Sequence, residues 1–426
     1  MTRALRALIV ATAALLVATA CGSSSSDKGD GDTETVKLTF WTHTHPPMIE
    51  LNKKLIGEYE AKHPNVKISY EQIPNTEFAT KMLTALSNGS GPDIINMDDV
   101  ALRGEYIPKN LLAPMDAAAA SKAESGYVDG TLDGAKGPDG KLYGLPTEFN
   151  ATAFAINKKH FEDAGLDPAK PPATWADVAA MGKKLVAAGH EGFNFLYLHS
   201  GWYTQQLQTL LNETGGSILT PDGSKSALAQ PQSVQALQIW NDLIRKDKVG
   251  NADTASREAT VPFDDFASGR RSMTMIYPWA VAQLKADNPD VYKQIEVVPL
   301  PQVDPAQPTG RWYGYYMAVN KASKQQAEAW KFIEFVTSEH DRWLTDVNFV
   351  QPVVGWENSA AAKAGVPFLD VWAKAYSQGK FDEVAPHYSE VQDEIKSAVE
   401  RTIFDGVGPA PSMQQASKAI DQILAG

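Results

Sequence analysis

The chain has 426 residues and carries 39 Lys and Arg against 51 Asp and Glu, which gives a formal net charge of −12. This acidic balance disfavours nucleic acid and anionic lipid headgroups as partners, because both are negatively charged themselves. The length exceeds what one hydrophobic core usually organises, so we expect two domains.

The N-terminus has the pattern of an export signal. Arg3 and Arg6 precede an apolar run over residues 7–17. This run is too short for a transmembrane helix, which needs roughly 20 apolar residues. Small residues then lead to Cys21, the only cysteine of the chain, which has no partner for an internal disulfide. We predict that residues 1–20 form a cleaved signal peptide.

The setting of Cys21 resembles the lipobox of bacterial lipoproteins, although Ala18 stands where that motif favours leucine. The resemblance implies that Cys21 is acylated, becomes the new N-terminus and anchors a lipoprotein to the outer face of the cell membrane. An ordinary export signal with an incidental cysteine is the alternative. Residues 21–35 are rich in Ser, Gly and Asp, and their low apolar content predicts a disordered tether.

Strands and helices alternate after the tether. Residues 38–41 predict a strand, and the apolar residues between 48 and 59 recur at helical spacing. Residues 66–70 alternate as a second strand, residues 78–86 carry a second helical stripe, and a third strand follows at 93–96. This order predicts a wound α/β sheet.

The middle and C-terminal thirds are rich in helical patterns. Thr174 and Asp177 have capping-box spacing, in which each side chain accepts from the backbone of the other residue, so a helix is expected to begin there. Apolar stripes over residues 234–244 and 329–336 predict two further amphipathic helices. We expect these segments to form a second domain with its own core.

Short motifs follow one another along the chain at residues 38–41, 81–85, 91–94, 111–116, 143–146, 154–158, 172–175, 266–270, 298–301 and 329–333. In their order and spacing they resemble the family 1 extracellular solute-binding proteins of ABC importers. This family includes maltose-, oligosaccharide- and glycerol-phosphate-binding proteins.

The resemblance implies an α/β, bilobal, periplasmic-binding-protein-like fold of type II that closes around its ligand by a hinge. The first lobe is expected to hold residues 36–150 plus 297–316, and the second lobe residues 151–296 plus 317–426. Residues 147–153 would form a hinge strand. The resemblance further implies a monomer without cofactor or catalysis, whose partners are a carbohydrate and the permease subunits of an ABC importer.

A sugar has apolar C–H faces and a rim of hydroxyl groups, so its site needs aromatic rings together with carboxylates and amides. We expect such side chains where strands end, at lobe crossovers and in loops. The candidate ligand-binding residues are Trp41, His43, Asp98, Asp99, Glu148, Asn150, Trp202, Tyr203, Tyr277, Trp279, Arg311, Tyr313 and Gly314. Each aromatic residue could instead belong to a core, and each acid could cap a helix.

Two of these candidates carry further information. Trp279 ends a Tyr-Pro-Trp sequence where the resembling family commonly has a Gly-Pro-Trp turn. Around Tyr313, alternate side chains of a strand share a face, so Tyr313 and Tyr315 should point one way and Trp312 and Tyr316 the other. These four rings therefore cannot all contact one ligand.

Two other classes of function remain as alternatives. A secreted glycoside hydrolase would need an acid and base pair, for which the candidates are Asp98, Asp99, Glu148, Asp264 and Asp265. A metal-delivery protein could use His43, His45 and His63, although no cysteine joins this set. No phosphate-binding loop, nucleophile elbow or nucleotide fingerprint occurs in the sequence.

A phosphorylated polyol is the main alternative within the binding class. Phosphate would call for arginine side chains, and the candidates are Arg103, Arg270, Arg271 and Arg311. The combination of aromatic residues with carboxylates favours an uncharged ligand, because the carboxylates would repel phosphate. We therefore predict a binding protein for a neutral carbohydrate.

Overall fold

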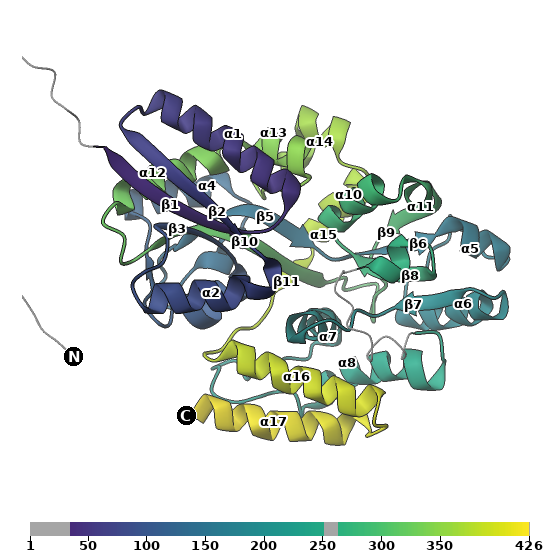
Figure 1. Ribbon diagram of the computed structural model, residues 1–426. Helices are drawn as coiled ribbons and strands as arrows, with labels where there is room; N and C mark the ends of the chain where they lie inside the picture. Colours follow the sequence, from purple (N-terminus) through teal and green to yellow (C-terminus); the bar gives the residue numbers. More distant parts are fainter. Residues whose placement is uncertain (1–34, 251–262, 426) are drawn as a thin grey trace, which may run out of the picture. The chain divides into compact units, whose positions relative to one another are not determined.

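The computed structural model describes residues 35–250 and 263–425 (Figure 1). The predicted signal peptide, Cys21 and the tether up to residue 34 lie outside the described residues. Residues Val36–Gly426 form one compact unit. No helix among the described residues has the length and apolar character needed to cross a membrane.

The first sheet contains seven strands. They are β1 (Val36–His43), β2 (Val66–Ile73), β3 (Ile94–Asp98), β4 (Leu112–Ala113), β5 (Gly144–Ala151), β10 (Gly310–Asn320) and β11 (Gly379–Phe381). The order runs β11-β10-β3-β1-β2, and β4 and β5 also pair with β10. β1 is parallel to β2 and β3, whereas β10 is antiparallel to β3 and β5. The predicted strand, helix, strand order over residues 38–96 is confirmed.

The helices on the first sheet include α1 (Pro46–Lys62), α2 (Asn75–Ser87) and α12 (Gln326–Thr337). α1 begins with two prolines, whose missing N–H groups cost nothing in a first turn, and buries the predicted stripe that includes Leu51 and Tyr59. The ring of Phe332 on α12 packs against Tyr59 at 5.1 Å and against Phe40 of β1 at 6.1 Å. The two helices therefore bury their apolar faces in one core.

The second sheet has the order β7-β8-β6-β9. Its strands are β6 (Ala153–Asn157), β7 (Glu191–Asn194), β8 (Arg271–Ile276) and β9 (Ile295–Val298). The longer helices in this part of the chain are α6 (Trp175–Ala187), α7 (Ser200–Thr214), α8 (Pro231–Asn241), α10 (Pro278–Asp287), α16 (Tyr388–Ile403) and α17 (Pro409–Ala425). The capping box predicted at Thr174 and Asp177 opens α6, with both reciprocal hydrogen bonds present.

Shorter helices and helical turns complete the described elements. They are α3 (Asp99–Ala101), η1 (Leu102–Tyr106), α4 (Ala117–Gly126), η2 (Thr131–Ala135), α5 (Lys158–Asp163), η3 (Asp242–Lys246), α9 (Asp264–Ala267), α11 (Pro289–Gln294), α13 (His340–Arg342), η5 (Trp343–Val347), η6 (Trp356–Asn358), α14 (Ala360–Gly365) and α15 (Leu369–Tyr376).

The described chain passes between the two sheets at Thr152, over residues 299–309 and over residues 382–387. The predicted return segment at 297–316 differs from this, because β9 belongs to the second sheet and β10 continues to Asn320. Residues 317–426 were assigned to the second lobe, whereas β10 and β11 belong to the first sheet and α12 packs in the cluster around Phe40. The stripe over 329–336 indicates burial, but it does not reveal which core the helix joins.

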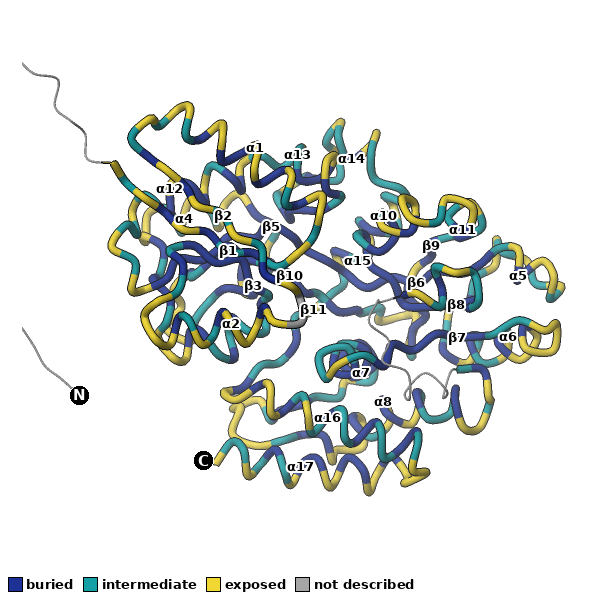
Figure 2. Tube along the Cα trace, in the orientation of Figure 1, coloured by how far each residue is buried: buried dark blue, intermediate teal, exposed yellow. Residues whose placement is uncertain are grey.

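Buried residues form three clusters, to which both strands and helices contribute, and the strands are buried along much of their length (Figure 2). One cluster lies on the first sheet around Phe40 and Phe332, and a second lies around β6 and α7. The third includes Phe149 and Tyr313 of the first sheet together with Tyr277, which follows β8 of the second. This third cluster brings candidate site residues from both sheets together.

Candidate functional site

Three neighbouring strands of the first sheet place polar and aromatic side chains side by side. Tyr315 of β10 pairs with Glu148 of β5 on one side and with Asp98 of β3 on the other. Paired residues share a face of a sheet, and adjacent strands lie about 4.8 Å apart, so two carboxyl-bearing residues flank one tyrosine. Both carboxyl groups help to raise the pKa of Tyr315 well above its ordinary value, after burial.

A second row on the same face contains Tyr313 and Asn150, which pair directly. The amide of Asn150 donates to Glu148 at 2.7 Å, which links the two rows. On the opposite face, Trp312 packs against Phe381 and the hydroxyl of Tyr316 donates to the carbonyl oxygen of Thr131 at 2.6 Å. The predicted alternation of these four rings along β10 is confirmed.

Tyr315 and Tyr313 belong to a longer line of rings that we call the aromatic row. It is formed by His43, Tyr315 and Tyr313 of the first sheet, Trp279 of α10 and Trp202 of α7. The ring centroids of His43 and Tyr315 are 4.6 Å apart. The indole N–H of Trp279 on α10 donates to the hydroxyl of Tyr313. Trp202, in the first turn of α7, lies 6.5 Å from Trp279.

Further aromatic side chains surround the second-sheet end of the aromatic row. Tyr277 meets the ring of Tyr313 at right angles, with a centroid distance of 5.1 Å. Phe263 packs against Trp279 at 5.6 Å and against Trp202 at 5.8 Å. The arrangement offers the flat apolar faces that a sugar ring stacks on.

Burial determines the protonation states of His43 in the aromatic row and of the acids beside it. Glu148 is 4% exposed, and burial raises its pKa to about 7 against the lowering effect of the Asn150 hydrogen bond. Burial also raises the pKa of Asp98, although its carboxylate accepts from the backbone of Ala101 at 2.9 Å. Burial lowers the pKa of His43 to about 3, so this ring is neutral at physiological pH.

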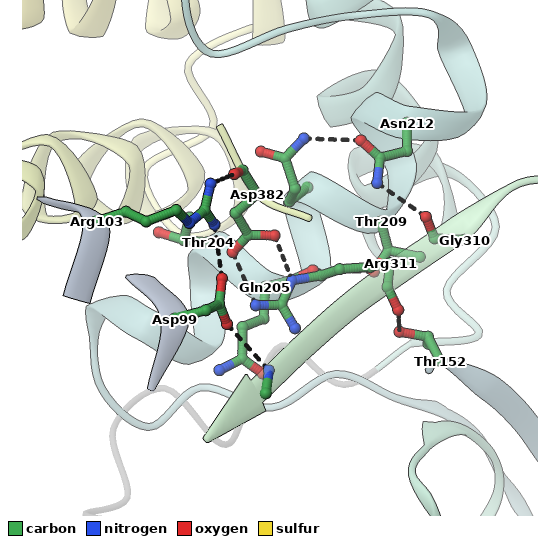
Figure 3. Close-up of polar contacts among 12 residues, drawn as sticks. Asp99, Arg103, Thr152, Thr204, Gln205, Thr209, Asn212, Gly310, Arg311 and Asp382 are labelled. Carbon is green, nitrogen blue, oxygen red and sulfur yellow. Dashed lines mark hydrogen bonds and ion pairs between the residues drawn. The ribbon is translucent and has the colours of Figure 1, made fainter. Parts of the chain in front are cut away.

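Four charged residues form what we call the ionic network, made of the buried Asp99, Asp382 and Arg311 and the half-buried Arg103 (Figure 3). Arg103 donates to Asp99 at 2.6 Å and to the carbonyl oxygen of Asp382 at 3.1 Å. The carboxylate of Asp382 receives two hydrogen bonds from Arg311, at 2.6 and 2.8 Å. Burial raises the pKa of Asp99 to about 6, while Arg103 opposes the shift.

The ionic network holds the segment of β10 that carries Tyr313. Asp99 accepts from the backbone N–H of Gly314 at 3.0 Å, and Arg311 lies 5.2 Å from the ring centroid of Tyr313. Ionic groups therefore hold β10 on both sides of Tyr313, at Gly314 and at Arg311. Asp99, Arg311 and Gly314 take part in the site by positioning this strand.

Trp41 and Tyr203 lie apart from the aromatic row. Trp41 shares a face of β1 with His43, and the ammonium group of Lys81 on α2 lies 4.9 Å from its ring centroid. Tyr203 is buried in the second core, where its hydroxyl donates to Glu400 at 3.0 Å. Neighbouring residues of a helix point about 100° apart, so Trp202 reaches the site and Tyr203 does not.

Tyr315, Phe263 and Asp382 belong to the site region but were not among the sequence candidates. The alternation along β10 already placed Tyr315 with Tyr313, so a sequence signal for it existed. Asp382 follows Arg311 by 71 positions, and no local pattern connects the two.

Among the hydrolase candidates, Asp264 and Asp265 lie on a short helix beside β8, whereas Asp98 and Glu148 lie on either side of Tyr315 in the first sheet. Asp265 begins a short helix and binds Arg270 at 2.7 Å, in a different part of the chain from Glu148. His45 caps the start of α1, whereas His63 follows its end and packs on Tyr59. In residues 35–250 and 263–425, no group of three or more His, Cys, Asp and Glu side chains could hold a metal ion.

A cavity of about 260 Å³ lies beside two of the crossovers. Its lining includes Thr152, Pro299, Gly310, Lys374 and Gln378, and it shares no residue with the aromatic row. Gln378 accepts hydrogen bonds through its carbonyl oxygen from Gly310 at 3.2 Å and from Thr309 at 3.3 Å. The cavity therefore borders the segments that connect the two sheets and is separate from the site.

Comparison with known proteins places this arrangement in a family. Residues 46–342 match the family described as bacterial extracellular solute-binding protein. A putative binding protein of Brucella abortus is 25% identical over 94% of this chain and 95% of its own length. A maltotriose-binding protein of Pyrococcus abyssi is 22% identical over 71% of this chain and 62% of its own length.

A solved structure shares the fold. It is an ABC transporter solute-binding protein of Thermotoga lettingae bound with alpha-D-tagatose, with a TM-score of 0.78 and 22% sequence identity. The likeness covers 92% of this chain and all of the other chain. The predicted type II bilobal α/β fold is confirmed.

Proposed function

The chain belongs to the family of bacterial extracellular solute-binding proteins, and we propose that it captures a carbohydrate and delivers it to the permease of an ABC importer without catalysing a reaction. The aromatic row, with Glu148, Asn150 and Asp98 beside it, is the observation that carries this proposal. Stacking rings bind the C–H faces of a sugar, and carboxylate and amide groups bind its hydroxyls. The maltotriose- and tagatose-binding relatives support the same ligand class.

Capture requires the two lobes to separate. Trp279 follows the second sheet, Tyr313 lies in the first, and their hydrogen bond occupies space that a sugar ring would fill. Rotation about the crossovers at Thr152, 299–309 and 382–387 would open the site, and closure would return both rings to the ligand.

The charge pattern supports a sugar without a phosphate group over a phosphorylated ligand. Arg103 and Arg311 are bound to acids within the ionic network, and Arg270 and Arg271 pair with Asp265 and Glu191. These arginines are therefore committed to carboxylates of the chain. Glu148 and Asp98 would repel a phosphate group placed against Tyr315.

The setting of Cys21 supports a lipoprotein that is anchored to the outer face of the cell membrane, and we further propose that the protein acts as a monomer. Radiolabelled palmitate should be incorporated into the wild-type protein in cells and not into a Cys21→Ala variant. Release of the wild-type protein into the medium without label would contradict the anchor.

A thermal-shift screen of the mature protein against a panel of sugars tests the proposed ligand class. A ligand at 100 times its dissociation constant stabilises the folded state by about 2.7 kcal/mol. We expect at least one sugar to raise the melting temperature, no effect of sugar phosphates, and no new reducing ends after incubation with oligosaccharides. A shift with sugar phosphates alone, or hydrolysis of an oligosaccharide, would overturn the proposal.

A further inference from the structure

Glu148 differs from Asp99 and Asp382 because no basic side chain of the described residues pairs with it. Its hydrogen-bond donor is the neutral amide of Asn150 at 2.7 Å. Among the described residues, neither Glu148 nor Asp98 forms an ion pair, whereas Asp99 binds Arg103 and Asp382 binds Arg311. Both arginines form ion pairs within the network, and the charge of Arg311 also lowers the pKa of Asp98, so Glu148 is the acid that is left without a counter-charge among the described residues.

A buried carboxylate without a counter-charge is costly, because the interior solvates it poorly. The cost is removed if the group takes up a proton or if a cation binds beside it. His43 adds no positive charge beside Tyr315, since its buried ring is neutral. A cation at this place must therefore come from the ligand.

The aromatic side chains around Glu148 also favour a cation. Glu148 pairs with Tyr315 across β5 and β10, and Asn150 pairs with Tyr313 on the same face. The faces of tyrosine rings attract cations through their quadrupole. A carboxylate flanked by ring faces is the combination that binds an ammonium group on a small organic molecule.

Resting on the proposed function, we propose that the site selects sugars bearing an amine, with the ammonium group placed against Glu148 and the rings of Tyr313 and Tyr315. Uncharged sugars bind more weakly because they leave the carboxylate uncompensated. Acidic sugars are excluded by repulsion from Glu148 and Asp98. Glu148 is thus the residue that determines the charge class of the ligand.

Proton exchange on binding separates this proposal from ordinary sugar recognition. The pKa of Glu148 in the free protein is about 7. An ammonium group stabilises the carboxylate and lowers this pKa, so binding near pH 7 releases protons. A neutral sugar that only excludes water from the site raises the pKa of Glu148 further, so its binding is accompanied by proton uptake.

Isothermal titration calorimetry of the mature protein, in buffers of different ionisation enthalpy, tests the proposal. The probes are hexose, hexosamine, N-acetylhexosamine and hexuronate in the gluco, galacto and manno series, as monosaccharides and disaccharides. Charge-assisted hydrogen bonds are about twice as strong as neutral ones, so we expect the hexosamine to bind about tenfold more tightly than the hexose, with proton release.

The variant Glu148→Gln keeps the shape and removes the charge, and it should reduce the ratio of hexosamine to hexose affinity to about one. Glu213→Gln is the matched control, because Glu213 is also buried with a raised pKa but binds Trp175 and the backbone of Val303. It should leave the ratio unchanged.

The outcomes separate this inference from the proposed function. If hexoses bind as tightly as hexosamines, with proton uptake, or if the preference survives in Glu148→Gln, the amine selectivity is wrong and sugar binding stands. If no sugar of any series binds, the proposed function itself fails.

Discussion

The ionic network and the aromatic row meet on the same stretch of β10, where Arg311 lies 5.2 Å from the ring of Tyr313, yet their acids are compensated in different ways. In the network every carboxylate meets an arginine, and Asp382 receives two hydrogen bonds from Arg311. Beside the aromatic row, Glu148 accepts one hydrogen bond from the neutral amide of Asn150 and has no basic partner among the described residues. The charges of the network are paired within the chain, whereas the carboxyl group of Glu148 has no ion-pair partner among the described residues.

This difference divides the candidate residues by role. Asp99, Arg311 and Gly314 form bonds within the chain that position β10. Glu148, Tyr313, Trp279 and Trp202 present carboxylate and ring surfaces to one another across the two sheets. Substitutions in the two regions should therefore change different quantities.

The largest expected effect comes from breaking the ionic network at Asp382. Asp382→Asn leaves the charge of Arg311 buried without compensation, and the free energy of unfolding should fall by about 3–5 kcal/mol. The exposed pair Lys81–Glu71 is the control, since Glu71→Gln should cost under about 1 kcal/mol. Urea denaturation measures both changes, and equal effects would show that the buried pair is unimportant for stability.

The next effect concerns the pH dependence that Glu148 gives to folding. Its pKa is raised from 4.5 to about 7, so between these values the folded state holds a proton that the unfolded state has lost. Protonated Glu148 contributes about 3 kcal/mol to the free energy of unfolding. This contribution is fully present below pH 4.5 and is lost as the pH rises to 7. Glu148→Gln should remove this slope.

Denaturation of wild type and Glu148→Gln at several pH values measures this contribution. The difference between their unfolding free energies should change steadily from pH 4.5 to 7 and stay constant outside that range. Parallel curves across the whole range would mean that Glu148 is solvated in solution.

Local patterns predicted the elements of both regions but not their partnerships. The stripe of α1 that includes Leu51 and Tyr59, the capping box of α6, and the alternation around Tyr313 depend on residues close in sequence, and the structure confirms them. Each of these patterns states which face is buried. None states which core that face meets.

The errors arose where distant segments decide the outcome. The helix over 326–337 joins the first core because β10 continues beside β3 as far as Val319, which no local pattern reveals. Tyr203 was predicted to contact the ligand, but a rotation of one residue along α7 places it in the second core. Asp382 could not be assigned to Arg311 from sequence, because the pair closes a loop of 71 residues.

Trp279 tests the aromatic row directly. Trp279→Ala removes a stacking face and should weaken sugar binding by about 1–3 kcal/mol. Tyr203→Phe is the control, because it removes a hydroxyl from the second core and should leave affinity unchanged. Titration followed by tryptophan fluorescence or calorimetry gives both values, and unchanged affinity in Trp279→Ala would remove this ring from the site.

Gly314 is the residue at which the two regions meet, and it gives the last prediction. A Cβ atom there would lie 2.9 Å from the carbonyl oxygen of Glu148 and 3.0 Å from the ring of Tyr316. Gly314→Ala should therefore lower the free energy of unfolding by about 1–3 kcal/mol through overpacking. Gly57 on α1 has no atom within 4 Å of such a Cβ, so Gly57→Ala should raise stability by up to about 1 kcal/mol.

The opposite signs expected for the two alanines make the comparison sharp, because the added methyl group is the same in both. Movement of the Glu148 backbone away from Gly314 would carry its carboxylate with it, so Gly314→Ala should also weaken sugar binding while Gly57→Ala leaves it unchanged. Equal stabilisation in both variants would mean that β5 and β10 can move apart at this point, and the register of Glu148 with Tyr315 would then be too loose to define a binding site.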